Sequence, residues 1–325
     1  MKQLAEMIKP YLKLLRVENL VFVAVLLFVM EKWVATPLLQ LAQFTEQMPW
    51  WVLALLIIAT VCIAAGGYVI NDYFDVKIDR INRPDDLVVT RAITRDGAMR
   101  LFIVLSAIGV VTGLTTAWWA KSWTLMMVFV VVPGLLWFYS ASYKRQLIVG
   151  NIVVAFISAL VPLLVAIVNA DYLNHLYGEA LVYTPIIGHL YVWLGGFGLF
   201  AFLMTLLREM VKDIEDIEGD REMECRTMPI VWGVKATKII VTVLLLVTVV
   251  LIAYGGLSLL PFPHDWHTLS SRFIIFGMMI PLLGALALLW AGKTPVEYHR
   301  VQMIIKFAMF MGVMYSFVIQ QNLLV

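Results

Sequence analysis

Long apolar segments constrain the fold of this chain more than any other feature. A helix that crosses the hydrocarbon core of a bilayer needs about 20 consecutive apolar residues. Hydrophobic residues make up 62% of the chain and charged residues only 14%, which excludes an ordinary soluble domain. We predict an all-α polytopic membrane protein with nine transmembrane helices, over residues 17–36, 51–71, 100–120, 123–141, 148–168, 188–210, 236–258, 271–292 and 303–324.

The positions of Lys and Arg predict how these helices are oriented. Cytoplasmic loops of membrane proteins carry an excess of basic residues. With nine spans and a cytoplasmic N-terminus, all but Lys32, Lys121 and Arg272 of the 24 basic residues fall on the cytoplasmic side. A wrong helix count would disrupt this alternation. No cleavable signal peptide is expected, because the N-terminal stretch lacks a small-residue site in the usual place.

The rest of the composition indicates one membrane domain over residues 1–325. Cys62 and Cys225 lie in different regions, so we interpret both as free thiols. His264 and His267, in a predicted outer loop, have a spacing that metal sites also use. Two histidines in an exposed loop are more often solvated, and we interpret these two in that way.

Two acidic stretches, each following an apolar segment, share one spacing. NDYFDVKIDRINRPD begins at Asn71, and REMVKDIEDIEGDRE begins at Arg208. On a continuous helix, carboxylates spaced D-x-x-D-x-x-x-D lie within one 60° stripe, because each residue turns the helix by about 100°. The spacing puts Glu215 and Glu218 on the opposite side, toward solvent or a cationic loop. The two stripes hold Asp72, Asp75 and Asp79, and Asp213, Asp216 and Asp220.

The repeated motif indicates a metal and phosphate site. A single acidic run is usually a solvated helix end, but two runs with one spacing on one side of the membrane favour a shared function. Carboxylate oxygens suit Mg²⁺, which binds one or two carboxylates together with substrate phosphates. Basic residues nearby would stabilise a diphosphate, although each could instead be a cytoplasmic anchor. They are Arg80, Arg83, Lys144, Arg145, Arg208, Lys212 and Arg221.

A phosphate site at a membrane boundary predicts a substrate with a charged head and an apolar tail. A polyprenyl diphosphate is such a molecule. Loss of its diphosphate leaves an allylic cation, which aromatic faces stabilise. Aromatic candidates near the motifs, for each of which simple packing is the alternative, are Tyr68, Tyr73, Phe74, Trp137, Tyr139 and Tyr143.

The two motifs together resemble those of the UbiA superfamily of intramembrane prenyltransferases. Members have nine transmembrane helices around a central cavity and transfer a prenyl group with Mg²⁺. The resemblance implies catalytic roles for Asp72, Asp75, Asp79, Asp213, Asp216 and Asp220. It implies metal binding by Asn71, Asp75, Asp79, Asp216 and Asp220. It implies substrate binding by Arg16, Asn19, Asn71, Arg83, Tyr139, Lys144, Arg208 and Lys212.

The chain departs from the family pattern at two places. Arg16 and Asn19 match the family's R-P-x-N motif, but its proline is missing. Many members follow the first motif with R-P-L-x-S-G, whereas this chain has DDLVVTRAIT over residues 85–94. The loop over the diphosphate is therefore expected to differ, with Arg91 or Arg95 in place of the usual arginine.

The acceptor stays open between two classes. The stretch REMVKDIEDIEGD is most similar to the digeranylgeranylglyceryl phosphate synthase branch, which implies geranylgeranyl transfer to a glycerol phosphate ether lipid. An aromatic acceptor of quinone synthesis, hydroxybenzoate or dihydroxynaphthoate, is the alternative. Glu209 is a weak candidate for a general base. A transporter is the rival of another class, but transporters bind near the bilayer midplane, whereas these acids cluster at one face.

Overall fold

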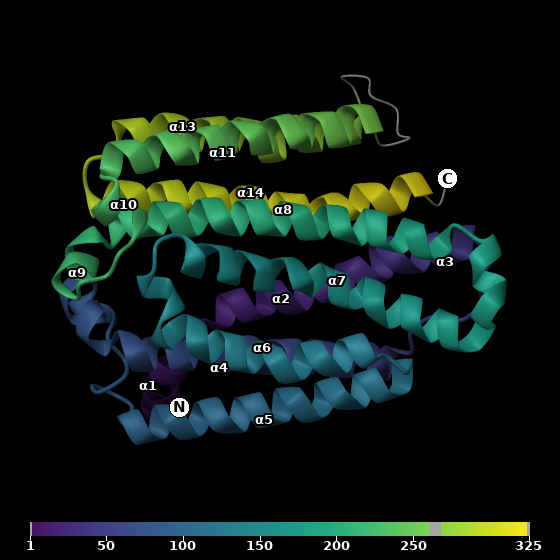
Figure 1. Cartoon of the computed structure of the whole chain (residues 1–325), viewed down its shortest axis with the longest axis horizontal. Coiled ribbons are helices and arrows are strands. Elements are labelled where there is room, and N and C mark those ends of the chain that lie inside the picture. Colours follow the sequence, from purple (N-terminus) through teal and green to yellow (C-terminus); the bar gives the residue numbers. More distant parts are fainter. Residues whose placement is uncertain (1, 260–267, 324–325) are drawn as a thin grey trace.

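Helices form nearly all the regular structure in the computed structural model, which describes residues 2–259 and 268–323 (Figure 1). His264 and His267 lie outside the described residues. The first half contains α1 (Lys2–Leu14), α2 (Val17–Val29), η1 (Met30–Ala35), α3 (Thr36–Leu41), α4 (Trp50–Asn82), η2 (Pro84–Asp86), α5 (Arg95–Ala120), α6 (Trp123–Ala141) and η3 (Tyr143–Arg145). The second half contains α7 (Val149–Tyr177), η4 (Gly178–Tyr183), α8 (Ile186–Glu215), α9 (Ile217–Glu222), α10 (Met228–Val231), α11 (Val234–Tyr254), η5 (Gly255–Leu259), α12 (Leu269–Arg272), η6 (Phe273–Met279), α13 (Ile280–Ala291) and α14 (Pro295–Leu323).

The described residues contain nine helices long and apolar enough to cross a bilayer, as predicted. The helix that holds the first motif is longer than predicted, because α4 continues from Trp50 to Asn82 without a break. At 1.5 Å per residue its 33 residues span about 50 Å, well beyond an apolar core of about 30 Å. The polar end of α4 therefore carries the first aspartate motif past the apolar segment.

The long helices lie side by side in one bundle (Figure 1). In the N-terminal part, α4 packs against α2, α5 and α6, and in the C-terminal part α8 packs against α7, α11 and α14. Leu27, Leu56 and Phe129 belong to a buried core between α2, α4 and α6. Leu207 and Ile305 belong to a second core between α8 and α14.

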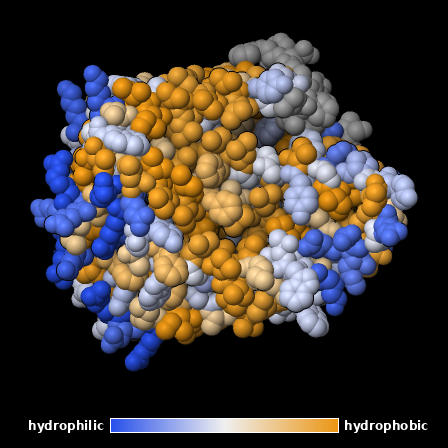
Figure 2. Space-filling view, in the orientation of Figure 1, coloured by the Kyte–Doolittle hydropathy of each residue, from blue (hydrophilic) through white to orange (hydrophobic). Residues whose placement is uncertain are grey.

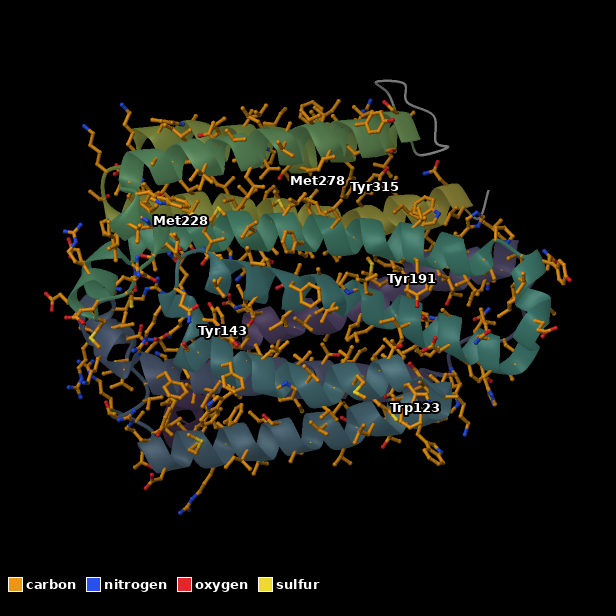
Figure 3. The ribbon with its side chains drawn as sticks, in the orientation of Figure 1. Trp123, Tyr143, Tyr191, Met228, Met278 and Tyr315 are labelled. Atoms are coloured by element: carbon orange, nitrogen blue, oxygen red, sulfur yellow. The ribbon has the colours of Figure 1, made fainter. Side chains whose placement is uncertain are left out.

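Polar and apolar residues are separated along the bundle axis. Figure 2 shows hydrophobic side chains across the middle of the visible face and hydrophilic ones gathered at the end where α9 and α10 lie. Tyr143 and Met228 lie toward that end, and Trp123 and Tyr191 lie toward the other (Figure 3). We call the end where α9 and α10 lie the motif end, because residues 71–82, 144 and 213–222 meet there.

Glu31 is an acidic residue inside a membrane-spanning segment. It lies in η1 within the first membrane span and its side chain is fully buried. Its carboxylate accepts hydrogen bonds from Asn169 Nδ2 at 2.8 Å and Thr36 Oγ1 at 3.2 Å. These partners satisfy a buried polar group that would otherwise be costly in a membrane. The two cysteines, Cys62 and Cys225, are free thiols, as predicted.

Candidate active site

The first aspartate motif lies on one face of α4. Because the helix is unbroken through Asn82, Asp72, Asp75 and Asp79 occupy a single stripe, as the spacing predicts. Asp75 is buried and the other two are half-buried. Asp72 is paired with Arg16, whose Nη2 lies 2.8 Å from its Oδ1. Arg16 precedes α2 in a left-handed conformation, with φ of 49°, and its guanidinium also covers the Tyr68 ring.

Asn71, Asp75 and Lys144 form a closed polar group at the start of the first motif. Asn71 Nδ2 donates to Asp75 Oδ2 at 2.8 Å. Lys144 Nζ donates to Asp75 Oδ1 and approaches Asn71 Oδ1 at 3.5 Å. Lys144 comes from η3, against which the first turn of α7 packs closely. A Cβ on Gly150 would lie 2.5 Å from the Lys144 Cα, so glycine at this position allows η3 to hold the lysine in place.

The second motif is not one continuous helix, and the prediction of a single stripe is wrong there. The α8 helix ends at Glu215 and α9 begins at Ile217, because Asp216 has φ of −92° and ψ of 8°. The turn brings Gly219 against the end of α4. Gly219 N donates to Asn82 Oδ1 at 2.8 Å, and Asn82 Nδ2 donates to the Asp216 carbonyl at 3.1 Å. Asn82 thus joins the two motifs.

Arg83, the residue after Asn82, binds the second motif with its side chain. Its Nη2 lies 2.9 Å from Asp216 Oδ1 and 3.1 Å from Glu215 Oε1. Glu215 also lies 3.3 Å from His299 Nδ1 and accepts a hydrogen bond from Gln302, both on α14. Of the two predicted environments for Glu215, solvent is therefore excluded. The other, a neighbouring cationic loop, is confirmed, because Glu215 is paired with Arg83 after the end of α4.

The remaining motif acids differ in how they are neutralised. Asp213 Oδ2 accepts a hydrogen bond from Asn151 Nδ2 at 2.9 Å, at the start of α7. Burial and the neighbouring Asp216 carboxylate raise the pKa of Asp220 to about 6. Lys212 interacts electrostatically with both Asp79 and Asp220, so it shares its one charge between the two motifs. Glu218 is exposed, as the spacing predicts.

A cavity extends from the motif end into the bundle, between α4, α6 and α7. The polar part of its lining includes Arg16, Asn71, Tyr139, Arg208, Glu209 and Lys212. Glu209 is paired with Arg208 at 2.7 Å. The apolar part includes Val23, Ile63, Val128, Phe129, Val161 and Leu164. The cavity therefore has a charged mouth and an apolar body.

Several predicted residues do not line this cavity. Among them are Lys144, Arg83 and the six motif aspartates, although Asn71 and Lys212, which neighbour them in sequence or space, do line it. Asn19 lies in the first turn of α2, and its N–H bonds the Arg16 carbonyl at 2.8 Å. Arg95 covers the Tyr73 ring at 4.7 Å from its centroid, and Arg91 is exposed. Phe74 packs edge-on against Trp137. Of the aromatic candidates, Tyr68 and Tyr139 line the cavity.

The donor set fits a hard divalent cation whose place is partly taken by protein cations. Among the described residues, no three His, Cys, Asp or Glu side chains are grouped as a ready metal site. Arg16, Lys144 and Arg83 each contact a motif aspartate. The available donors are carboxylate and amide oxygens, which are ligands that Mg²⁺ prefers.

Comparison with known proteins gives the same relatives by sequence and by fold. A digeranylgeranylglyceryl phosphate synthase from Sulfolobus acidocaldarius is 34% identical over 242 residues, covering 73% of this chain and 74% of the relative. One from Thermococcus kodakarensis is 31% identical over 257 residues, covering 77% and 78%.

Solved structures share the fold. A digeranylgeranylglyceryl phosphate synthase structure has a TM-score of 0.62 at 23% identity, covering 98% of this chain and 99% of that one. A UbiA homologue from Archaeoglobus fulgidus bound to GPP and Mg²⁺ has a TM-score of 0.55 at 16% identity, covering 96% and 99%. Residues 33–312 match the UbiA prenyltransferase family model. The chain belongs to the UbiA prenyltransferase family.

Proposed function

We propose that this protein is a Mg²⁺-dependent intramembrane prenyltransferase that moves a geranylgeranyl group from its diphosphate to geranylgeranylglyceryl phosphate. The observation that carries the proposal is the joining of the two aspartate motifs next to an apolar cavity, whose polar lining includes Asn71 of the first motif and Lys212, the neighbour of Asp213 in the second. The mouth suits a diphosphate and a metal, and the cavity suits an isoprenoid tail. The relatives named as digeranylgeranylglyceryl phosphate synthases support this acceptor.

The metal would be held by the first-motif residues Asn71, Asp75 and Asp79 and by Asp216 and Asp220 of the second motif. When bound, it would neutralise charge that develops on the departing diphosphate. Arg16, Arg83, Lys144, Arg208 and Lys212 are the basic residues available to bind phosphate oxygens. Their charge-assisted hydrogen bonds become stronger as the leaving group gains charge, which favours the transition state.

The chemistry exchanges one carbon–oxygen bond for another. The bond between the prenyl C1 and the diphosphate oxygen breaks, and its electron pair leaves with diphosphate. Tyr68 and Tyr139 line the cavity at the depth of Asn71 and Arg208, where aromatic rings stabilise an allylic cation. The acceptor hydroxyl oxygen then bonds to C1 and loses its proton. Glu209 is the carboxylate in the cavity lining, and we assign it as the base that takes this proton.

The site is proposed to face the cytoplasm of a cell (inner) membrane, in a single domain over residues 1–325. The bias of Lys and Arg toward the motif end supports this orientation. A transporter would require a central binding site. The buried acid Glu31, however, is held by Asn169 and Thr36 and is not part of the cavity lining among the described residues.

Transfer of radiolabel by the purified protein tests the function. We expect label from geranylgeranyl diphosphate to enter geranylgeranylglyceryl phosphate only when Mg²⁺ is present. Asp75→Asn and Asp216→Asn should each reduce the rate at least about 100-fold, because each removes a carboxylate that would hold the metal, and the metal would neutralise charge on the leaving group. Label entering only hydroxybenzoate or dihydroxynaphthoate would assign the protein to quinone synthesis. Binding of donor without release of diphosphate would support a transporter.

A further inference from the structure

The Lys144 ammonium lies where a cation held by the first motif would lie. It contacts Asp75 Oδ1 and approaches Asn71 Oδ1, while Asn71 closes the group by donating to the second Asp75 oxygen. Asn71 and Asp75 are two of the residues assigned to the metal. A protein cation therefore satisfies these oxygens in the structure.

The position allows little room for a second cation. Only 13% of the Lys144 side chain and 11% of the Asp75 side chain are exposed, so solvent screens their charges weakly. A like charge in contact disfavours another cation at the same carboxylate. Nearby charges of this kind change the proton affinity of a carboxylate by about 10- to 1000-fold.

The surroundings of Lys144 determine where it can go when it is displaced. Lys212 and Arg145 are among its closest electrostatic neighbours, and both repel it. Asp220 and Asp72 attract it, but Asp72 is already paired with Arg16. A bound diphosphate would supply a new anionic partner for Lys144. Its oxygens can accept hydrogen bonds from the Lys144 ammonium while the metal binds Asp75.

We propose that Lys144 is a resident counter-ion that makes metal and prenyl diphosphate bind cooperatively. In the free protein it occupies the metal position on Asn71 and Asp75. The diphosphate attracts the ammonium away and opens this position, so each ligand favours the other. This inference rests on the proposed function. Its consequence is that the free protein binds metal weakly and that the two ligands raise each other's affinity by the same factor.

Metal binding by the full-length protein in detergent tests this inference without turnover. Free Mn²⁺ is followed by electron paramagnetic resonance, with and without geranylgeranyl thiolodiphosphate, and is corrected for binding to the analogue alone. Lys144→Met should bind Mn²⁺ alone at least about tenfold more tightly than the unmodified protein, because the competing charge is gone. The enhancement by the analogue should shrink correspondingly.

Two controls separate this effect from a general loss of positive charge. Lys144→Arg keeps the competing charge and should keep the weak metal affinity. Lys235→Met removes an exposed lysine near the start of α11 and should leave metal binding unchanged. Lys144→Gln is a second uncharged variant, in case Lys144→Met does not fold.

The outcomes distinguish this inference from the proposed function. Equal Mn²⁺ affinity in the unmodified protein and in a folded, uncharged variant would overturn the counter-ion role, even if prenyl transfer is intact. Failure of the unmodified protein to transfer any prenyl group would overturn the proposed function instead. Tighter metal binding in the uncharged variant, together with weaker coupling, would support the counter-ion role.

Discussion

Arg83 neutralises two neighbouring acids that belong to one motif. Its guanidinium contacts Asp216 and Glu215, and it extends from the end of the helix that carries the other motif. Breaking such a pair leaves partly buried carboxylates next to each other, which destabilises a fold more than the pair itself stabilises it. Arg83 is thus both a candidate ligand for diphosphate and a structural link.

Arg83→Met should therefore affect stability and binding together. We expect a loss of about 1–2 kcal/mol, limited because Arg83 is about one-third exposed, and donor binding weaker by at least about tenfold. Thermal unfolding in detergent and calorimetric titration with geranylgeranyl thiolodiphosphate measure the two effects. Lys77→Met, which removes an exposed lysine from the same helix, is the matched control. Unchanged stability in Arg83→Met would contradict the link.

The sequence predicts which acidic residues form the site better than it predicts the residues that pair with them. The spacing of Asp72, Asp75 and Asp79 fixes their common face, because a helix turns by a constant angle. The partner of each acid depends on elements far away in the sequence. Lys144 is 69 residues from Asp75, and Arg83 is 133 residues from Asp216. Periodicity carries no information about such contacts.

At the scale of elements, the contact between α4 and α9 depends on a glycine. A Cβ on Gly219 would lie 2.6 Å from both terminal atoms of the Asn82 side chain. Gly219→Ala should push α9 away from α4 and break the bonds of Asn82 to Gly219 N and to the Asp216 carbonyl. We expect a cost of about 1–3 kcal/mol, as for other overpacked sites, and a loss of most prenyl transfer.

Unfolding temperature and transfer rate measure these two effects. Gly134→Ala is the control, because a Cβ there meets nothing within 4 Å in the middle of α6. That change should stabilise the helix by about 0.5–1 kcal/mol. A Gly219→Ala protein as active as Gly134→Ala would show that the contact between α4 and α9 is not required.

The break between α8 and α9 shows why part of the site could not be predicted. The apolar runs identify each span, because bilayer thickness sets the length of a helix. After Glu215 the chain is polar, and helix propensity alone would continue the helix through Asp216. The interruption instead serves a tertiary contact, since the turn is what brings Gly219 to Asn82. No local pattern in the second motif shows this partner.

At the scale of the whole molecule, the two ends of the bundle should lie on opposite sides of the membrane. The positive-inside rule places the motif end in the cytoplasm, and this orientation stays a prediction. We expect a cysteine replacing exposed Trp232, near the motif end, to resist a membrane-impermeant maleimide in intact cells. A cysteine replacing exposed Trp123, at the other end, should react. If the Trp232→Cys variant reacts and the Trp123→Cys variant does not, the motif end faces the outside and the predicted orientation is wrong.

The depth of the cavity should select the length of the donor. Between Tyr139 at the mouth and Phe129, α6 runs ten residues, or about 15 Å. Phe129 lines the apolar body of the cavity; its side chain is 2% exposed and its ring packs beside Gly113. A smaller side chain at this position extends the space available to a prenyl tail.

Phe129→Leu should therefore shift the preference from geranylgeranyl toward geranylfarnesyl diphosphate, with the ratio of their kcat/KM values changing by about tenfold. One extra or missing group in an apolar pocket changes discrimination by about 10- to 200-fold. Leucine is chosen because a full truncation to alanine costs about 3–5 kcal/mol in a core. Val130→Ala, at an exposed position one residue further along α6, is the control and should leave the ratio unchanged. An unchanged ratio in a stable Phe129→Leu protein would mean that the prenyl tail does not reach this residue. Phe129 would then not determine which donor length the protein prefers.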